Sequence, residues 1–320
     1  MVTEAGKQVD MELFQSQALQ VVDSVKKVVV GKEDMIVDLF IAMLAEGNVL
    51  LEGVPGVAKT SLAKAFASAL GLEFKRIQFV PDILPGDIIG MSIYNQRSGT
   101  FETRKGPIFT NILLVDEINR ASPKIQSALL EAMEEKQVSI DGATFKLPSP
   151  FMVITTQNPI DIAGTFPLPE AQIDRFMFKL DVGYLSPEDE LAMLRVKNNS
   201  VVAQEQRVLS REDIVRLIDM VKNVRTDDRV LEYIRDLIVA SRGHDKLLLG
   251  GSPRASIALL KASKALAAIN GRDYVIPDDI KYLVPKVLSH RLIVKPELEL
   301  ENVSTADIIE ELLNEVPVPV

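Results

Sequence analysis

The first two-thirds of the chain alternate short apolar runs, rich in β-branched residues, with amphipathic stretches. This alternation is typical of strands that are joined by crossover helices within one parallel sheet. The runs ILLV and FMVIT are almost entirely apolar, as expected for central strands that helices cover on both faces. The pattern predicts five strands, at Asn48–Glu52, Glu73–Gln78, Ile112–Val115, Phe151–Thr155 and Phe176–Leu180.

The pattern changes after Leu185, where the stretch KNNSVVAQEQRVLS is polar and aperiodic. The segments that follow have helical spacing, and each begins with residues that favour a helix start, at Ser210, Thr226, Ser252-Pro253 and Pro277. We therefore predict an α/β core over residues 1–195, a linker over 196–209 and a smaller, all-α domain over 210–320.

Composition and charge narrow the classes of function. The chain has 320 residues, of which 47% are apolar and 25% charged, which indicates a soluble globular protein with room for two domains. A net charge of −9 argues against a protein whose main task is to bind nucleic acid through its phosphates. The chain has no cysteine and only two histidines, so thiolate zinc sites are excluded and Mg²⁺ brought by a nucleotide is the expected metal.

Neither a membrane span nor a secretion signal is expected. The apolar run from Met35 to Leu51 is interrupted by Asp38 and Glu46, so it predicts a buried helix followed by a strand. The N-terminal stretch MVTEAGKQVDMELF lacks the basic start and apolar centre of a signal peptide. These features predict a cytoplasmic location.

The stretch GVPGVAKT, residues 53–60, is a candidate phosphate-binding loop between a predicted strand and a predicted helix. Lys59 would meet the β- and γ-phosphates and Thr60 would bind Mg²⁺, while the helix dipole favours an anion. The usual pattern has glycine before the lysine, and Ala58 is compatible with the loop if its φ angle is negative. The alternative is a turn without a ligand. The predicted nucleotide contacts here are Gly53, Val54, Pro55, Gly56, Val57, Ala58, Lys59, Thr60 and Ser61.

A pair of carboxylates completes the candidate site. The buried run NILLV ends in Asp116-Glu117, and ligands bind at this carboxyl edge of open α/β sheets. We predict that Asp116 holds the Mg²⁺ shell together with Thr60 and that Glu117 polarises the attacking water. Two acids after a strand also cap helices, but that alternative is weaker about 56 residues beyond a phosphate loop.

Together, GVPGVAKT and LLVDEINRA resemble the AAA+ ATPases, and more closely the MoxR subgroup, in which alanine before the loop lysine is usual. The resemblance runs from VVVGKEDM to DDIKYLVPKVLSHRL, over most of the chain. It implies a P-loop NTPase fold with a five-stranded parallel sheet between helices and a helical lid. It also implies that the protein is an enzyme that hydrolyses ATP with Mg²⁺.

Four further residues take roles by resemblance. VITTQNP is similar to the sensor-1 strand, which implies that Asn158 orients the water or contacts the γ-phosphate. LPEAQIDRF matches the segment with the arginine finger, which implies that Arg175 reaches a neighbouring subunit's site. GSPRAS resembles sensor 2, which implies that Arg254 faces a nucleotide phosphate, and VVVGK resembles the adenine-side loop with Gly31. An Asn-Pro turn and a solvated arginine are the alternatives for Asn158 and Arg254.

Two segments resemble AAA+ insertions. Phe79–Asn95 falls where the family has its helix-2 insert, and Gln137–Leu147 predicts a hairpin that turns at Asp141-Gly142. Both could contact a client protein, although ordinary connecting loops are an equal alternative.

The resemblance also implies partners. Similar proteins are oligomeric, typically hexameric, chaperone-like ATPases that support maturation of a target protein, commonly beside a partner with a von Willebrand factor A domain. Two other classes stay open: a nucleotide-switched scaffold without productive turnover, and a helicase-like nucleic-acid motor, which the net acidity disfavours.

Overall fold

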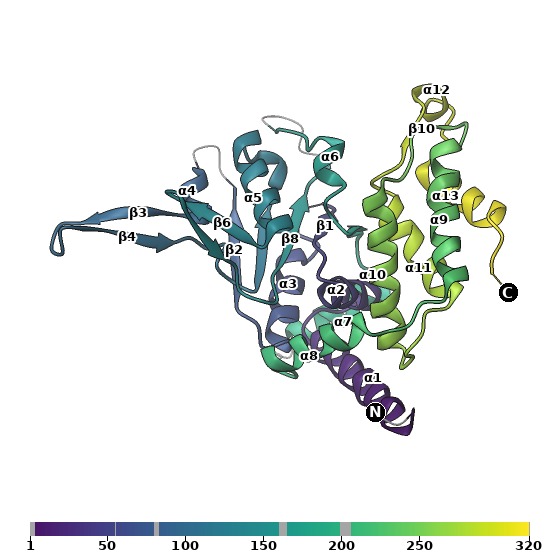
Figure 1. Cartoon of the computed structure of the whole chain (residues 1–320), viewed down its shortest axis with the longest axis horizontal. Coiled ribbons are helices and arrows are strands. Elements are labelled where there is room, and N and C mark those ends of the chain that lie inside the picture. Colours follow the sequence, from purple (N-terminus) through teal and green to yellow (C-terminus); the bar gives the residue numbers. More distant parts are fainter. Residues whose placement is uncertain (1–3, 55, 80–82, 160–164, 199–205, 320) are drawn as a thin grey trace.

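The computed structural model describes residues 4–54, 56–79, 83–159, 165–198 and 206–319 (Figure 1). Five parallel strands form the central sheet in the order β2-β5-β8-β1-β9. All five predicted strands are confirmed, and no boundary differs by more than two residues. The strands are β1 (Val49–Glu52), β2 (Phe74–Gln78), β5 (Ile112–Asp116), β8 (Met152–Gln157) and β9 (Phe178–Asp181).

Helices cover both faces of this sheet. Every residue of β5 is buried, and its side chains alternate between two hydrophobic clusters. Ile112 and Leu114 face the cluster that contains α1, α2 and α3, whereas Leu113 and Val115 face the cluster that contains α5. The helices are α1 (Glu4–Lys26), α2 (Glu33–Leu44), α3 (Lys59–Ala69) and α5 (Pro123–Glu135). The apolar runs that predicted the strands are therefore explained by burial on both sides.

The C-terminal third forms a helical lid beside the sheet (Figure 1). The predicted helical character is confirmed, and one short antiparallel pair is added to it. A last helix of the core side, α7 (Pro187–Asn198), precedes the lid, and the predicted domain limits at residues 195 and 209 stay a prediction. The elements after α7 are α8 (Arg211–Lys222), α9 (Asp228–Gly243), β10 (Leu247–Leu249), α10 (Pro253–Ile269), α11 (Pro277–Leu288), β11 (Ile293–Val294), α12 (Pro296–Glu299) and α13 (Thr305–Glu315).

Side-chain caps explain where the lid helices begin. The Ser210 hydroxyl accepts the Asp213 N–H at 3.1 Å, and the Ser252 hydroxyl accepts the Arg254 N–H at the same distance. The predicted start at Thr226 is wrong by one residue, because the Asp227 carboxylate accepts the Arg229 N–H and caps α9.

Two hairpins depart from the sheet. The predicted turn at Asp141-Gly142 is confirmed: it joins β6 (Gln137–Ile140) to β7 (Ala143–Lys146), and its φ angles of 47° and 83° are those of a tight hairpin turn. The predicted insertion contains α4 (Pro85–Ile89) and β3 (Gly90–Asn95), but the hairpin continues through β4 (Thr100–Lys105). This β3–β4 hairpin stands away from the sheet, and residues 80–82 lie outside the described part (Figure 1).

A buried polar contact joins the lid to the core. Asp38 on α2 lies 2.5 Å from the Lys286 amine on α11 and accepts a hydrogen bond from the Tyr282 hydroxyl at 3.1 Å. Burial raises the pKa of Asp38, and the Lys286 ammonium partly offsets this rise. Among the described residues, no helix is both long and apolar enough to cross a membrane.

Candidate active site

The phosphate loop turns between the end of β1 at Glu52 and the start of α3 at Lys59. Gly53 is needed because a Cβ there would lie 2.4 Å from the Val182 carbonyl oxygen. Gly56 has a φ of 87°, which glycine adopts without strain. The Lys59 amine donates to the Gly53 carbonyl at 2.5 Å and so points back into the loop. Pro55 lies outside the described residues.

Ala58 corrects one expectation. Its φ of 65° and ψ of 20° lie in the left-handed region, so the negative φ under which alanine was expected to fit the loop is not what the structure has. Ala58 is the residue immediately before α3, where the chain has to turn out of the loop before the helix can begin. The left-handed conformation makes that turn, at a cost of about 1–2 kcal/mol for a residue with a Cβ.

The two acids occupy different surroundings after β5. The Asp116 carboxylate accepts hydrogen bonds from Arg76 Nε at 2.5 Å and from the Thr156 hydroxyl at 3.2 Å. Glu117 has a left-handed φ of 56°, and its N–H donates to Thr156 Oγ1 at 2.9 Å. The Glu117 carboxylate lies 2.7 Å from Arg120 Nε. Thr156 on β8 therefore fixes the backbone and side chain of the acid pair together.

A cavity of about 350 Å³ opens at the carboxyl ends of β5 and β8, where the predicted residues of the loop and of the two strands meet. The predicted residues that line it are Gly56, Ala58, Lys59, Thr60, Ser61, Asp116, Glu117 and Asn158. Three more lining residues were not predicted: Arg76, Gln78 and Thr156. The two-residue spacing of Arg76 and Gln78 places both on one face of β2, but only the β2–β5 pairing brings that face to Asp116.

The chemistry of this cavity fits Mg²⁺-nucleotide. Burial lowers the pKa of Lys59, and the nearby carboxylates of Asp116, Glu117 and Glu52 partly offset that effect. A lysine ammonium at the N-terminus of α3 suits an anionic phosphate. In the described ranges, no cluster of three or more acidic or histidine side chains could hold a metal alone. A single carboxylate with a hydroxyl fits Mg²⁺, which proteins commonly bind together with substrate phosphates.

The remaining loop residues lie outside the cavity lining. Val57 packs partly buried against the core, and Val54 is half-buried. Gly31 has a φ of 70°, and a Cβ there would lie 2.6 Å from the Asp189 carboxylate. The neighbouring Lys32 donates to the Gly183 carbonyl at 2.8 Å. Contact between Gly31 and the adenine side of a nucleotide stays a prediction.

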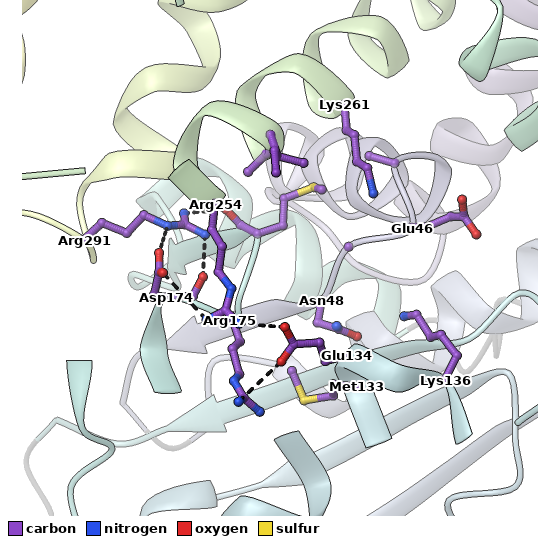
Figure 2. A pocket seen from close by; sticks show the side chains of 15 residues that line it. Glu46, Asn48, Met133, Glu134, Lys136, Asp174, Arg175, Arg254, Lys261 and Arg291 are labelled. Atoms are coloured by element: carbon purple, nitrogen blue, oxygen red, sulfur yellow. Dashed lines mark hydrogen bonds and ion pairs between the residues drawn. The ribbon is translucent and has the colours of Figure 1, made fainter. Parts of the chain in front are cut away.

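The two predicted arginines lie together in a second cavity of about 300 Å³ (Figure 2). The Glu134 carboxylate accepts a hydrogen bond from Arg254 at 2.6 Å and lies 3.3 Å from Arg175 Nη2. Lys136 and Lys261 line the same cavity, and burial lowers the pKa of Lys136 to about 8. The anions beside Arg254 in this structure are therefore the Glu134 carboxylate and, at 3.9 Å, the Asp174 carboxylate.

The two cavities lie at opposite ends of the parallel strands. Asn48 immediately precedes β1 and lines the second cavity, as does Met177 immediately before β9. The first cavity, which Lys59 and Asp116 line and which we call the phosphate cavity, instead opens where β5 and β8 end. The four residues of β1 alone span about 13 Å. Arg175 and Arg254 are thus separated by the sheet from the phosphate loop of their own chain.

This parallel sheet, with a phosphate loop after one strand, an acid pair after another and a helical lid, defines a P-loop ATPase of the AAA+ class. A family model described as "ATPase family associated with various cellular activities (AAA)" matches residues 48–178, and one described as "AAA lid domain" matches residues 239–312.

Several known proteins are similar over nearly the whole chain. Bacillus subtilis YeaC is 50% identical over 93% of this chain and 94% of its own length, and Mycobacterium tuberculosis "Chaperone MoxR1" is 43% identical over 92% and 80%. A Cytophaga hutchinsonii crystal structure, assigned as an ATPase, has a TM-score of 0.90, 43% identity and 97% coverage of both chains. The chain therefore belongs to the MoxR family of AAA+ ATPases.

Proposed function

We propose that this chain hydrolyses ATP with Mg²⁺ and that each active site is completed between two subunits of an oligomer. The observation that carries the proposal is the position of Arg175 and Arg254 at the sheet edge opposite the phosphate loop of their own chain. In a head-to-tail contact, these guanidinium groups would face the phosphates bound by the neighbouring subunit. There they would stabilise the charge that develops during phosphoryl transfer.

Within one chain, the residues around the phosphate cavity divide the remaining tasks. Lys59 and the N-terminus of α3 bind the β- and γ-phosphates, while Thr60 and Asp116 would hold Mg²⁺. When bound, Mg²⁺ neutralises charge on the phosphate oxygens. Glu117 polarises the attacking water, which requires its carboxylate to turn away from Arg120, and Asn158 orients that water.

Glu134 is the group that the incoming phosphates would replace. Its carboxylate now contacts both Arg175 and Arg254, so the two positive charges are partly neutralised within the chain. The multiply charged phosphates of a nucleotide would compete with this single carboxylate for the two guanidinium groups. The subunit contact and the completion of the active site would then depend on each other.

The wider role follows from the relatives. The relative named "Chaperone MoxR1" supports a chaperone-like remodelling or maturation function on a partner protein. We propose a cytoplasmic ring, typically a hexamer, that acts on a client beside a partner with a von Willebrand factor A domain. Nucleic acid is not an expected partner, because the net charge is −9.

The first test is the specific ATPase activity as a function of protein concentration, with Mg²⁺ and saturating ATP. Activity per subunit should rise with concentration, because Arg175 comes from another chain. A flat profile at readily measured rates would contradict shared sites. ATP binding without turnover at every concentration would favour a nucleotide-switched scaffold instead.

The second test removes the guanidinium group of Arg175, the proposed arginine finger. Arg175→Ala should lower kcat by about 10³-fold, since an arginine finger contributes at least this much in related phosphoryl transfers. ATP affinity should stay nearly unchanged, because Arg175 does not line its own chain's phosphate cavity. Arg235→Ala is the matched control, because Arg235 is 60% exposed on α9 and forms its ion pair with the neighbouring Asp236. Unchanged hydrolysis in Arg175→Ala would reject the assignment.

A further inference from the structure

Arg291, in the segment that follows α11, has a side chain only 3% exposed and is buried against the segment that carries Arg175. Its guanidinium donates to the Asp174 carboxylate at 2.7 Å and to the Asp174 carbonyl at 2.9 Å. It also donates to the carbonyls of Phe176 at 2.6 Å and Met177 at 3.2 Å. One side chain thus contacts the backbone on both sides of Arg175.

These hydrogen bonds satisfy carbonyl groups that lie outside regular secondary structure. Residues 174–177 lie between α6 (Glu170–Ile173) and β9, so their carbonyls are not part of a helix or a strand. The five N–H donors of an arginine can satisfy several such carbonyls at once and in a fixed geometry. The conformation of the segment that carries Arg175 therefore depends on a side chain that comes from the lid.

The same network reaches Arg254. The Ser252 hydroxyl donates to both oxygens of the Asp174 carboxylate, at 3.0 and 2.8 Å. It also accepts the Arg254 N–H at the start of α10. Asp174 is therefore bonded to Arg291 on one side (Figure 2) and, through Ser252, to the helix start that presents Arg254 on the other.

We propose that Arg291 is a positioning residue for the Arg175 finger: it touches no nucleotide and holds residues 174–177 so that Arg175 projects toward the neighbouring subunit. The inference rests on the proposed trans role of Arg175. The alternative is a buried ion pair that only stabilises the fold, so the test has to separate folding from finger geometry.

The test variant is Arg291→Met, measured by steady-state ATPase kinetics and by equilibrium binding of a fluorescent ATP analogue. A displacement of about 1 Å at a catalytic group costs about 100-fold, and we expect a fall in kcat of this size. The dissociation constant for the analogue should change by less than about threefold, because the phosphate cavity does not include Arg291.

A matched control comes from the other end of α10. Arg272 forms a two-bond pair with Asp279 at 2.9 and 2.6 Å, and the 17 residues of α10 place it about 25 Å from the finger segment. Arg272→Met removes a comparable ion pair and should leave kcat within about threefold of the unsubstituted protein. Equal kcat values in Arg291→Met and Arg272→Met would overturn the inference.

Complementation with Glu117→Gln separates the inference from the proposed function. Each single variant should have little activity alone, but a Glu117→Gln subunit still offers its intact finger to a neighbour. In an equal mixture with Arg175→Ala or with Arg291→Met, half of the subunits carry an intact Glu117. Random head-to-tail contacts give half of these subunits a Glu117→Gln neighbour with an intact finger. Both mixtures should therefore regain about a quarter of the unsubstituted activity.

The outcomes are distinct. Failure of Arg175→Ala to recover would reject the trans finger and the proposed function with it. Recovery of Arg175→Ala without recovery of Arg291→Met would overturn only the inference. If Arg291→Met does not fold, as judged by circular dichroism, Arg291→Lys replaces it in the same mixture. Lysine keeps the charge beside Asp174 but cannot span carbonyls on both sides of Arg175, so a partial kcat loss with recovery is expected.

Discussion

Two residues other than glycine, Ala58 and Glu117, have left-handed backbone conformations beside the phosphate cavity. Such conformations cost free energy and persist where the surrounding structure over-determines them, commonly at functional sites. Ala58 turns the chain into α3, and Glu117 turns it out of β5. Local strain at both positions therefore accompanies the geometry that brings the loop and the acid pair together.

Ala58→Gly tests this strain. Glycine removes a penalty of about 1–2 kcal/mol at Ala58 but adds about 0.4–1 kcal/mol of unfolded-state entropy, so the free energy of unfolding should rise by about 0.5–1 kcal/mol. The comparison is Ala128→Gly in the middle of α5, which should lower it by about 1 kcal/mol. Urea denaturation measures both, and a loss of stability in Ala58→Gly would contradict the left-handed assignment.

The sequence predicted the residues of the phosphate cavity better than those of the second one. Lys59, Thr60, Asp116 and Glu117 belong to short motifs whose flanking strands determine where they lie. Arg254 was expected to face a phosphate, but its motif contains no information about which sheet edge the lid covers. That depends on how α10 packs against α2, a contact between segments some 200 residues apart in sequence.

At the scale of elements, the strands were predictable because their burial on two faces leaves a continuous apolar signal. The β3–β4 hairpin was only partly anticipated, because β4 is exposed along its whole length and its sequence, TFETRK, has no apolar periodicity. The contact between α2 and α11 was not anticipated either, since Asp38 in an apolar run indicated only an interruption.

The Asp38–Lys286 pair gives a prediction for how these two helices are joined. Lys286→Met leaves a buried carboxylate without its cation and should lower the free energy of unfolding by about 3 kcal/mol. Asp38→Leu combined with Lys286→Met removes both charges and should recover most of that loss. Denaturation of the two single variants and the double variant completes the cycle. A change below about 0.5 kcal/mol in Lys286→Met would show that the pair is not energetically coupled.

At the scale of the whole molecule, the two cavities make one chain incomplete as an enzyme under the proposed arrangement. Glu117→Gln should slow hydrolysis and keep ATP bound, and because ATP would join two subunits, the assembled fraction should increase. Sedimentation velocity with ATP should show larger species for Glu117→Gln than for the unsubstituted chain. Lys59→Ala, which removes the proposed phosphate contact, should sediment as smaller species. Equal size distributions for Glu117→Gln and Lys59→Ala would contradict the coupling of ATP binding to assembly.

Because the two cavities lie at opposite ends of the strands, the number of complete active sites depends on whether the subunits form an open row or a ring. In an open row of n subunits joined head to tail, one end carries a nucleotide cavity without arginines and the other carries arginines without a nucleotide, so only n−1 sites are complete. Closing the row into a ring adds no new kind of contact, yet it supplies the missing site. ATP bound in the end cavity would therefore favour closure, and the last subunit to join would contribute two completed sites at once.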